Sequence, residues 1–180
     1  DLSRKMLSVA AEKLAPHGDR VALMHQRAES LPFPDDTFDA VCCLEALEFM
    51  MDPRAVLHEL VRVLRPGGLL VLTNRQGRDA KLMPGQTFSH EALERILRDE
   101  VGISEVDVQP WQVDYRIVWA VKAGNSPAAG PLALEEVWRC PRCSAIDWVR
   151  VEGGWRCLTC EARVARGADG VIEAERLQGS

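Results

Sequence analysis

The chain has 180 residues, of which 47% are hydrophobic and 27% are charged, and its formal net charge is -5. A chain of this length can bury one good core and carry a small additional module, and it has no run of about 18 apolar residues that could span a bilayer. The negative balance argues against strong non-specific attraction to nucleic acid, because that attraction depends on Lys and Arg neutralising phosphates.

The first predicted element is a helix that begins after Ser3 and ends at the Pro-His-Gly sequence of residues 16–18. Residues 21–24 follow as a short buried strand. Asp1 would stand where an earlier strand ends and this helix begins, at the edge where open parallel sheets bind ligands. A solvated carboxylate that the helix dipole favours is the competing interpretation of Asp1.

Residues 29–74 predict a buried strand, a loop, an amphipathic helix and a second buried strand, which is half of an open α/β sheet. The first of these strands, residues 39–44, is a continuous apolar run. Such a run is typical of a central parallel strand that is covered on both faces. We therefore expect Cys42 and Cys43 to be small core residues.

The helix of this pattern begins at Asp52, with Pro53 at its first position. Its apolar stripe can pack on the sheet and leaves His58 outward, which favours a surface role for His58 over a catalytic one. The Pro-Gly-Gly sequence of residues 66–68 breaks the helix and turns the chain into the strand of residues 69–73. The whole is predicted to be a βαβ unit.

After Asn74 a polar loop runs to about Thr87, and it is long enough to be a lid over a crevice or simply a mobile loop. Ser89 caps the next helix, which Gly102 closes. Alternating apolar residues through 106–121 predict two half-exposed strands that pair antiparallel at the sheet edge.

Residues 123–131 read AGNSPAAGP and form a linker by composition. The region beyond them has several tryptophans but too few aliphatic residues for a core of its own, so it needs a staple. Two Cys-x-x-Cys knuckles separated by thirteen residues supply one: Cys140, Cys143, Cys157 and Cys160. Four thiolates complete a tetrahedral site that fits structural Zn2+ and leaves no position for water, with a redox dithiol or an iron site as the alternatives.

Gly153 and Gly154 lie between the knuckles and suggest a hairpin turn, so the module is expected to be a zinc ribbon. The cysteine pattern suits a reducing compartment better than a disulfide framework, and we expect a cytoplasmic protein. Arginines in the ribbon could contact phosphates, but acidic residues nearly balance them, which favours a solvated surface of mixed charge.

Five features occur in a fixed order: DLSRKML, AESLPFPDDTFDAV, LEALEF, ELVRVLRPGGLLVLTN and the closing pair of strands. Together they resemble class I S-adenosylmethionine-dependent methyltransferases, particularly the ubiquinone/menaquinone branch. The resemblance implies an α/β fold with a Rossmann-like methyltransferase sheet, and S-adenosyl-L-methionine as cofactor. The resemblance covers residues 1–122, a partial methyltransferase domain. Composition and the cysteine spacing then predict a linker at 123–133 and a zinc-ribbon module at 134–176.

The resemblance also implies the cofactor-binding residues Asp1, Ala28, Glu29, Leu44 and Glu45. Asp1 corresponds to the carboxylate that accepts both ribose hydroxyls, and Ala28 falls where a backbone N–H reads the adenine edge. Arg27 stands where the family commonly has an Asp that accepts from the adenine amino group. Because Arg has no acceptor, Glu29 or a main-chain carbonyl must substitute, or adenine recognition is altered.

No residue receives a catalytic role, since Phe49 replaces the His that is frequent in this family. The family's first strand and its glycine-rich turn would precede Asp1. We therefore expect an N-terminally truncated piece of a longer protein, or a non-homologous segment in that place. Either way, the piece alone is expected to bind the cofactor poorly.

The ribbon sequences CPRC, CLTC and GADGVIEAE are similar to Trm112-type zinc ribbons, which associate with methyltransferases, although Val164 and Ala165 stand where an aromatic-proline pair is usual. A protein partner bound through the ribbon is therefore possible. Acidity favours a small-molecule acceptor, whereas the ribbon favours an RNA or protein acceptor. The competing hypothesis is a non-catalytic scaffold built on a degenerate methyltransferase fold.

Overall fold

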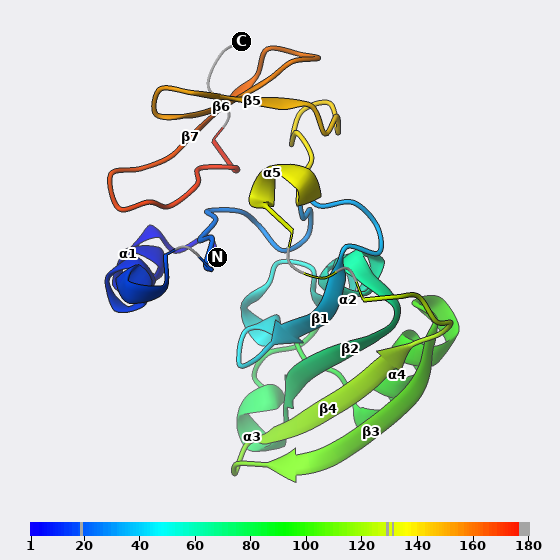
Figure 1. Cartoon of the computed structure of the whole chain (residues 1–180). Coiled ribbons are helices and arrows are strands. Elements are labelled where there is room, and N and C mark those ends of the chain that lie inside the picture. The colour runs from blue at the N-terminus through cyan, green and yellow to red at the C-terminus, as the bar shows by residue number, and fades with distance from the viewer. Residues whose placement is uncertain (19, 129, 131, 177–180) are drawn as a thin grey trace. The chain divides into compact units, whose positions relative to one another are not determined.

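The structure is a computed structural model that describes residues 1–18, 20–128, 130 and 132–176. These residues form two compact units, each of which is described by itself (Figure 1). The sheet unit is Asp35–Gly130, and the ribbon unit combines the described residues of Asp1–Pro34 and Pro131–Ser180. No helix among the described residues is long and apolar enough to cross a membrane.

The sheet unit contains a four-stranded sheet in the order β1-β2-β4-β3. Its strands are β1 (Phe38–Cys43), β2 (Leu64–Arg75), β3 (Ile103–Trp111) and β4 (Tyr115–Lys122). β1 runs parallel to β2, and β4 is antiparallel to both β2 and β3. The expected α/β sheet and its closing antiparallel pair are therefore confirmed, with β4 inserted between β2 and the edge strand β3.

Helix α2 (Pro53–Val63) connects the two parallel strands as the sequence predicts. Asp52 caps it, because its carboxylate accepts from the N–H groups of Arg54 and Ala55 at 3.1 and 3.0 Å. The apolar stripe of the helix is buried, with Leu57 fully covered and Leu60 at 6% exposure. A short 3-10 turn, Leu47–Phe49, precedes the helix at the carboxyl end of β1.

The turn expected at Pro66, Gly67 and Gly68 is instead a bulge inside β2, which begins at Leu64 directly after α2. Phe38 of β1 pairs with Leu64, but Ala40 pairs with Leu69, so the residues between bulge out of the ladder. Gly67 has a φ of 76°, which favours glycine. A Cβ on Gly68 would stand 2.6 Å from Leu64 Cδ1 and 2.8 Å from the Arg65 carbonyl oxygen. Only glycine fits at position 68.

In the segment between β2 and β3, α4 (His90–Arg95) lies on the same face of the sheet as α2 (Figure 1). The segment also contains α3 (Gly77–Ala80) and a π-helical turn, Ile96–Glu100. Asn74 fixes the end of the loop, since its side chain donates to the Phe88 carbonyl at 2.8 Å and accepts from the Phe88 N–H at 3.3 Å. The polar loop after Asn74 thus carries a short helix and is tied back to the strand it leaves.

The burial expected for β1 is partly wrong. Cys43 is buried, at 7% exposure, but Cys42 is exposed, as are Asp39 and Ala40. Among the described residues β1 pairs only with β2, so one of its edges carries no strand. An apolar run predicts two covered faces, but it does not reveal which segments supply the cover. Val113, expected in a strand, instead lies in the β3–β4 turn and is 95% exposed.

The ribbon unit contains α1 (Arg4–Leu14), which Ser3 caps by accepting from the Met6 N–H at 3.3 Å, and a following 3-10 turn, Ala15–His17. It also contains α5 (Leu134–Val137) and a three-stranded antiparallel sheet. The strands of this sheet are β5 (Trp148–Val151), β6 (Gly154–Cys157) and β7 (Arg163–Ala165). The expected zinc-ribbon hairpin is thus present with a third strand.

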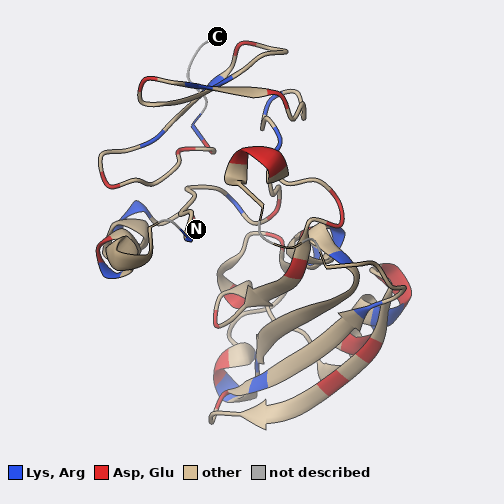
Figure 2. Ribbon diagram, viewed as in Figure 1, with Lys and Arg blue, Asp and Glu red and all other residues tan. Residues whose placement is uncertain are grey.

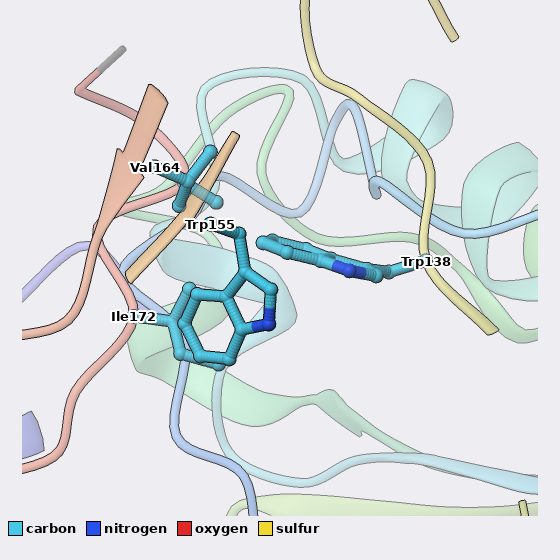
Figure 3. Close-up of a cluster of buried hydrophobic side chains, with 5 residues drawn as sticks. Trp138, Trp155, Val164 and Ile172 are labelled. Atoms are coloured by element: carbon cyan, nitrogen blue, oxygen red, sulfur yellow. The ribbon is translucent and has the colours of Figure 1, made fainter. Parts of the chain in front are cut away.

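An aromatic cluster forms the core of the ribbon unit (Figure 3). Trp138 stacks on Trp148 with ring centroids 4.4 Å apart and meets the edge of Trp155 at 5.4 Å. Val164, Ile172 and Ala174 complete the buried cluster, and Met24 and Phe33 pack against it. Each indole ring buries a large area, so the module has an apolar core in addition to its cysteine cluster, and residues before the sheet unit contribute to this core.

The expected linker begins against the sheet unit. The Ala123 N–H donates to the Gly102 carbonyl at 2.9 Å, and the Ser126 N–H donates to the Pro66 carbonyl at 3.2 Å. Residues 129 and 131 of the predicted linker lie outside the described residues.

Substituting Gly68 with Ala should destabilise the protein by about 1–3 kcal/mol, because the new methyl group would overlap backbone and the Leu64 side chain. Urea unfolding measures the change. Gly18→Ala is the matched control, because its Cβ would meet the nearest atom, the Ala15 carbonyl oxygen, at 3.4 Å. Equal unfolding free energies for the two variants would show that the bulge has room for a side chain.

Candidate functional site

The four knuckle cysteines converge on one point. Their Sγ atoms all lie within 4.8 Å of one another, with 3.6 Å between Cys140 and Cys160 and 3.6 Å between Cys143 and Cys157. A tetrahedron of sulfurs around zinc, with Zn–S bonds of about 2.3 Å, has edges of about 3.8 Å. The cluster therefore has the dimensions of a zinc site, as the sequence spacing predicts.

The two knuckles have the same backbone structure. In each, the first Cys donates its N–H to the carbonyl five residues on (Ala145 or Ala162), and its own carbonyl accepts from the residue four positions on (Ser144 or Glu161). Ser144 and Glu161 both adopt left-handed φ values, of 61° and 62°. This turn is what presents two sulfurs on one side of each knuckle.

The surroundings of the sulfurs do not by themselves ionise all four thiols. Burial raises the pKa of Cys140 to about 12, even though the N–H groups of Cys143 and Arg142 point at its sulfur. At Cys157 burial also works against ionisation, but the N–H groups of Cys160 and Thr159 help lower the pKa to about 7. A metal ion is the partner that allows all four thiols to be ionised together. All four ligands are protein sulfurs, so the residues present fit a closed structural zinc site.

Asp1 and the segment leading to Ala28 lie side by side in the ribbon unit. The Asp1 nitrogen bonds the Met24 carbonyl, and the Gln26 N–H donates to the Asp1 carbonyl, both at 3.2 Å. This is the pattern of two neighbouring parallel strands. The Asp1 side chain is exposed and accepts from the Ser3 N–H at 2.6 Å, and Ala28 and Glu29 are half-buried.

The tail of the ribbon lies along the other edge of the same segment. Met24 and Ile172 form a parallel bridge, in which the His25 N–H donates to Ile172 at 2.7 Å and Ile172 donates to Leu23 at 2.8 Å. His25 is buried, with Nδ1 2.8 Å from Glu173 Oε2 and Nε2 3.1 Å from the Leu2 carbonyl. In place of the strand predicted at residues 21–24, the structure has one β-bridge at Met24. The backbone there is hydrogen-bonded to the tail on one edge and to Asp1 on the other.

Leu44 and Glu45 belong to the sheet unit, at the carboxyl end of β1. Leu44 is 46% exposed, and Glu45 is exposed with a left-handed φ of 49°. Thr73 Oγ1 fixes this strained turn by accepting from the Glu45 N–H at 2.6 Å, and Gln112 donates to the Glu45 carboxylate at 3.2 Å. Non-glycine residues in this backbone region cluster at functional sites.

Sequence reasoning missed a buried polar cluster near the same strand ends. Glu48 is 1% exposed and accepts from the Tyr115 hydroxyl at 2.6 Å, while Arg75 lies 3.8 Å from the carboxylate and over the tyrosine ring. Burial, together with the bond to Glu48, raises the pKa of Tyr115 to about 12. The LEALEF motif contains two acidic residues, but the sequence alone does not show that Glu45 is exposed and Glu48 is buried.

The remaining charged residues form a mixed surface. Figure 2 shows Lys and Arg interspersed with Asp and Glu on both units. His58 is half exposed and lies 3.7 Å from Glu100 on the helix surface, as expected for a residue outside the site.

The first part of the chain matches a known family. Residues 1–72 match the family profile described as "Methyltransferase domain". The demethylmenaquinone methyltransferase of Clavibacter sepedonicus is 47% identical over 72 residues, which are 40% of this chain and 29% of that protein. The ubiquinone/menaquinone biosynthesis C-methyltransferase UbiE of Hahella chejuensis is 40% identical over 74 residues, or 40% of this chain and 30% of that protein. The chain spans less than a third of these relatives.

Solved structures agree with these sequence matches. A SAM-dependent methyltransferase from Aquifex aeolicus is 26% identical with a TM-score of 0.54, covering 67% of this chain and 65% of its own. The [4+2]-cyclase SpnF, 22% identical with a TM-score of 0.57, covers 69% of this chain and 64% of its own and shows a shared fold alone. The expected resemblance to class I methyltransferases is confirmed.

Purified protein should contain one equivalent of zinc, because four sulfurs surround a single point. Cys140→Ser and Cys157→Ser should each lose it, whereas Cys42→Ser, an exposed cysteine of the sheet unit, should retain it. Elemental analysis is the measurement. Less than half an equivalent in the unsubstituted protein would contradict the assignment.

Removing zinc with a chelator should also destabilise the segment around His25. The His25 N–H donates to the carbonyl of the tail residue Ile172, and Ile172 packs in the same core as Trp155. Hydrogen exchange should speed up in residues 23–26. Peptides from β4 serve as the internal reference, since β4 belongs to the sheet unit. Unchanged hydrogen exchange in residues 23–26 would show that the metal site of the ribbon does not stabilise this segment.

Proposed function

We propose that the protein containing this chain is an S-adenosylmethionine-dependent methyltransferase that carries a structural zinc ribbon. The observation that carries the proposal is the methyltransferase-domain match of residues 1–72, in which Asp1 lies beside the strand segment leading to Ala28. Fold likeness alone is weaker support, because one fold hosts many reactions.

The cofactor residues proposed are Asp1, Ala28, Glu29, Leu44 and Glu45. The exposed Asp1 carboxylate suits this role chemically, because its two oxygens can accept from two neighbouring ribose hydroxyls. Ala28 would offer its backbone N–H to the adenine edge. Leu44 and Glu45, at a strained turn, would form the wall contributed by β1.

Little further chemistry is required of the protein. S-adenosylmethionine supplies, when bound, an electrophilic sulfonium methyl group. The protein's part is to align a nucleophile and exclude water, and a base is needed only for a poor nucleophile. We assign no catalytic residue, and Phe49, 66% exposed, offers no proton-accepting group.

A small-molecule acceptor is the better candidate. The relatives from Clavibacter and Hahella bear the names of quinone-pathway methyltransferases, and the net charge of -5 disfavours an RNA acceptor. We place the protein in the cytoplasm, where thiols stay reduced and available to zinc. A protein partner bound through the ribbon is compatible with this role.

We keep the division into a partial methyltransferase domain at 1–122, a linker at 123–133 and a zinc ribbon at 134–176 as a proposal about sequence origin. The packing follows different boundaries, because Met24 and Phe33 of the methyltransferase-like segment contribute to the core of the ribbon unit.

A non-catalytic scaffold is the second candidate, favoured by one observation. Arg27 occupies the position beside Ala28 and is ion-paired with Glu175 of the tail. Ultraviolet crosslinking of labelled cofactor to the full-length protein distinguishes the two, because a pure scaffold should not be labelled.

Asp1→Ala in the full-length protein should weaken binding of S-adenosylmethionine by about 10- to 100-fold, the effect of losing hydrogen bonds to a charged group. Isothermal titration calorimetry measures the change. Asp107→Ala, which removes an exposed carboxylate of β3, is the control and should bind normally. Equal affinities for the two variants would show that Asp1 does not bind the cofactor.

A further inference from the structure

We propose that Glu175, in the tail of the zinc ribbon, is the residue that recognises the adenine amino group of the cofactor. The inference rests on the proposed function and adds a specificity residue from outside the methyltransferase-like segment. Its basis is the contact between Glu175 and the residue immediately before Ala28.

Backbone pairing brings Glu175 to this place. Beyond the bridge between Met24 and Ile172, the Glu175 N–H donates to the His25 carbonyl at 2.9 Å. The tail therefore follows the segment toward Ala28 through main-chain bonds, and the position of Glu175 does not depend on one flexible side chain.

Ion pairs hold the tail in the same register. Asp169 accepts from Arg4 at 2.8 Å and from Ser8 at 3.2 Å, and Glu173 contacts Arg4 at 3.0 Å. Both residues therefore tie the tail to α1 and its start. A side chain fixed by its surroundings loses less entropy when it binds a ligand.

The Glu175 carboxylate retains a free acceptor position. Oε1 accepts from Arg27 Nε at 2.8 Å and from Nη2 at 2.6 Å, whereas Oε2 has only the Arg27 backbone N–H at a long 3.4 Å among its described contacts. An ionised carboxylate offers about four lone-pair sites. The side chain is 23% exposed, so a ligand can reach it.

Arg27 explains why this acceptor is ionised and how its side chain is held. Its hydrogen bonds are the main reason that the pKa of Glu175 lies below its usual value. Arg27 itself carries donors only, so it cannot bind an amino group. Arg27 is thus a positioning residue, and the acceptor that its own position lacks is supplied by the tail.

Glu175 Oε2 offers an acceptor and the Ala28 N–H offers a donor, which are the two kinds of group that one edge of adenine can pair with. The exocyclic amino group donates and the neighbouring ring nitrogen accepts, so the edge needs one acceptor and one donor. A purine without the amino group would leave the carboxylate without its partner, and recognition of this kind discriminates strongly.

The test compares two ligands on the full-length protein by calorimetry. They are S-adenosylhomocysteine and its analogue in which hydrogen replaces the adenine amino group. The unsubstituted protein should prefer S-adenosylhomocysteine by about tenfold or more, the value of a hydrogen bond to a charged group. Glu175→Ala should abolish the preference and leave the analogue's affinity unchanged, and Glu175→Gln, which keeps a carbonyl acceptor, should retain part of it.

Two further variants complete the design. Arg27→Ala should reduce the preference, because Glu175 loses its anchor, and Glu152→Ala, in the β5–β6 turn, should behave like the unsubstituted protein. Zinc content is measured for each variant, so that a damaged ribbon is recognised. A preference that survives Glu175→Ala overturns the inference.

Tighter binding of both ligands by Glu175→Ala would also overturn it, since the Arg27–Glu175 pair would then be a latch that closes the site. If the unsubstituted protein binds neither ligand, the proposed function itself fails, and that result differs from every outcome that concerns Glu175.

Discussion

The ribbon unit depends on one short backbone segment, residues 23–26, that is hydrogen-bonded along both edges. Asp1 pairs with one edge and the tail around Ile172 with the other. Every main-chain group satisfied in this way avoids the cost of a buried unpaired amide. Met24 also packs against the core that contains Trp155, Val164 and Ile172. A segment that would be a marginal strand by itself thus becomes the joint between a methyltransferase-like sequence and a metal-binding module.

Through this joint, the cysteine cluster stabilises a part of the ribbon unit that lies away from the sulfurs. Four cysteines fix the two knuckles, the knuckles fix the strands that carry Trp148 and Trp155, and the resulting core fixes the tail with Glu173 and Glu175. In the proposed cofactor site, the ribbon contributes through Glu175, at the end of its tail. A scaffold and an enzyme would share this architecture, and SpnF shows that a similar fold exists in a protein named for cyclisation.

The sequence predicted the elements that depend on local patterns. Apolar runs and the Pro-Gly-Gly sequence indicated β1, α2 and β2, and the spacing of the cysteines indicated the sulfur cluster. It did not predict the features that depend on partners about 150 residues away, such as the bridge between Met24 and Ile172 or the pair between Arg27 and Glu175. The exposure of Cys42 and the burial of Glu48 were missed for another reason, because an apolar or acidic residue type does not indicate which segments cover it.

The most direct test of the central claim is a crystal structure of the full-length, zinc-loaded protein with S-adenosylhomocysteine. The account predicts the ribose hydroxyls on the Asp1 carboxylate, the adenine edge at the Ala28 N–H and Glu175, and zinc bound by the four knuckle sulfurs. A nucleoside bound away from Asp1, or a ribbon tail that does not pair with residues 23–26, would contradict it.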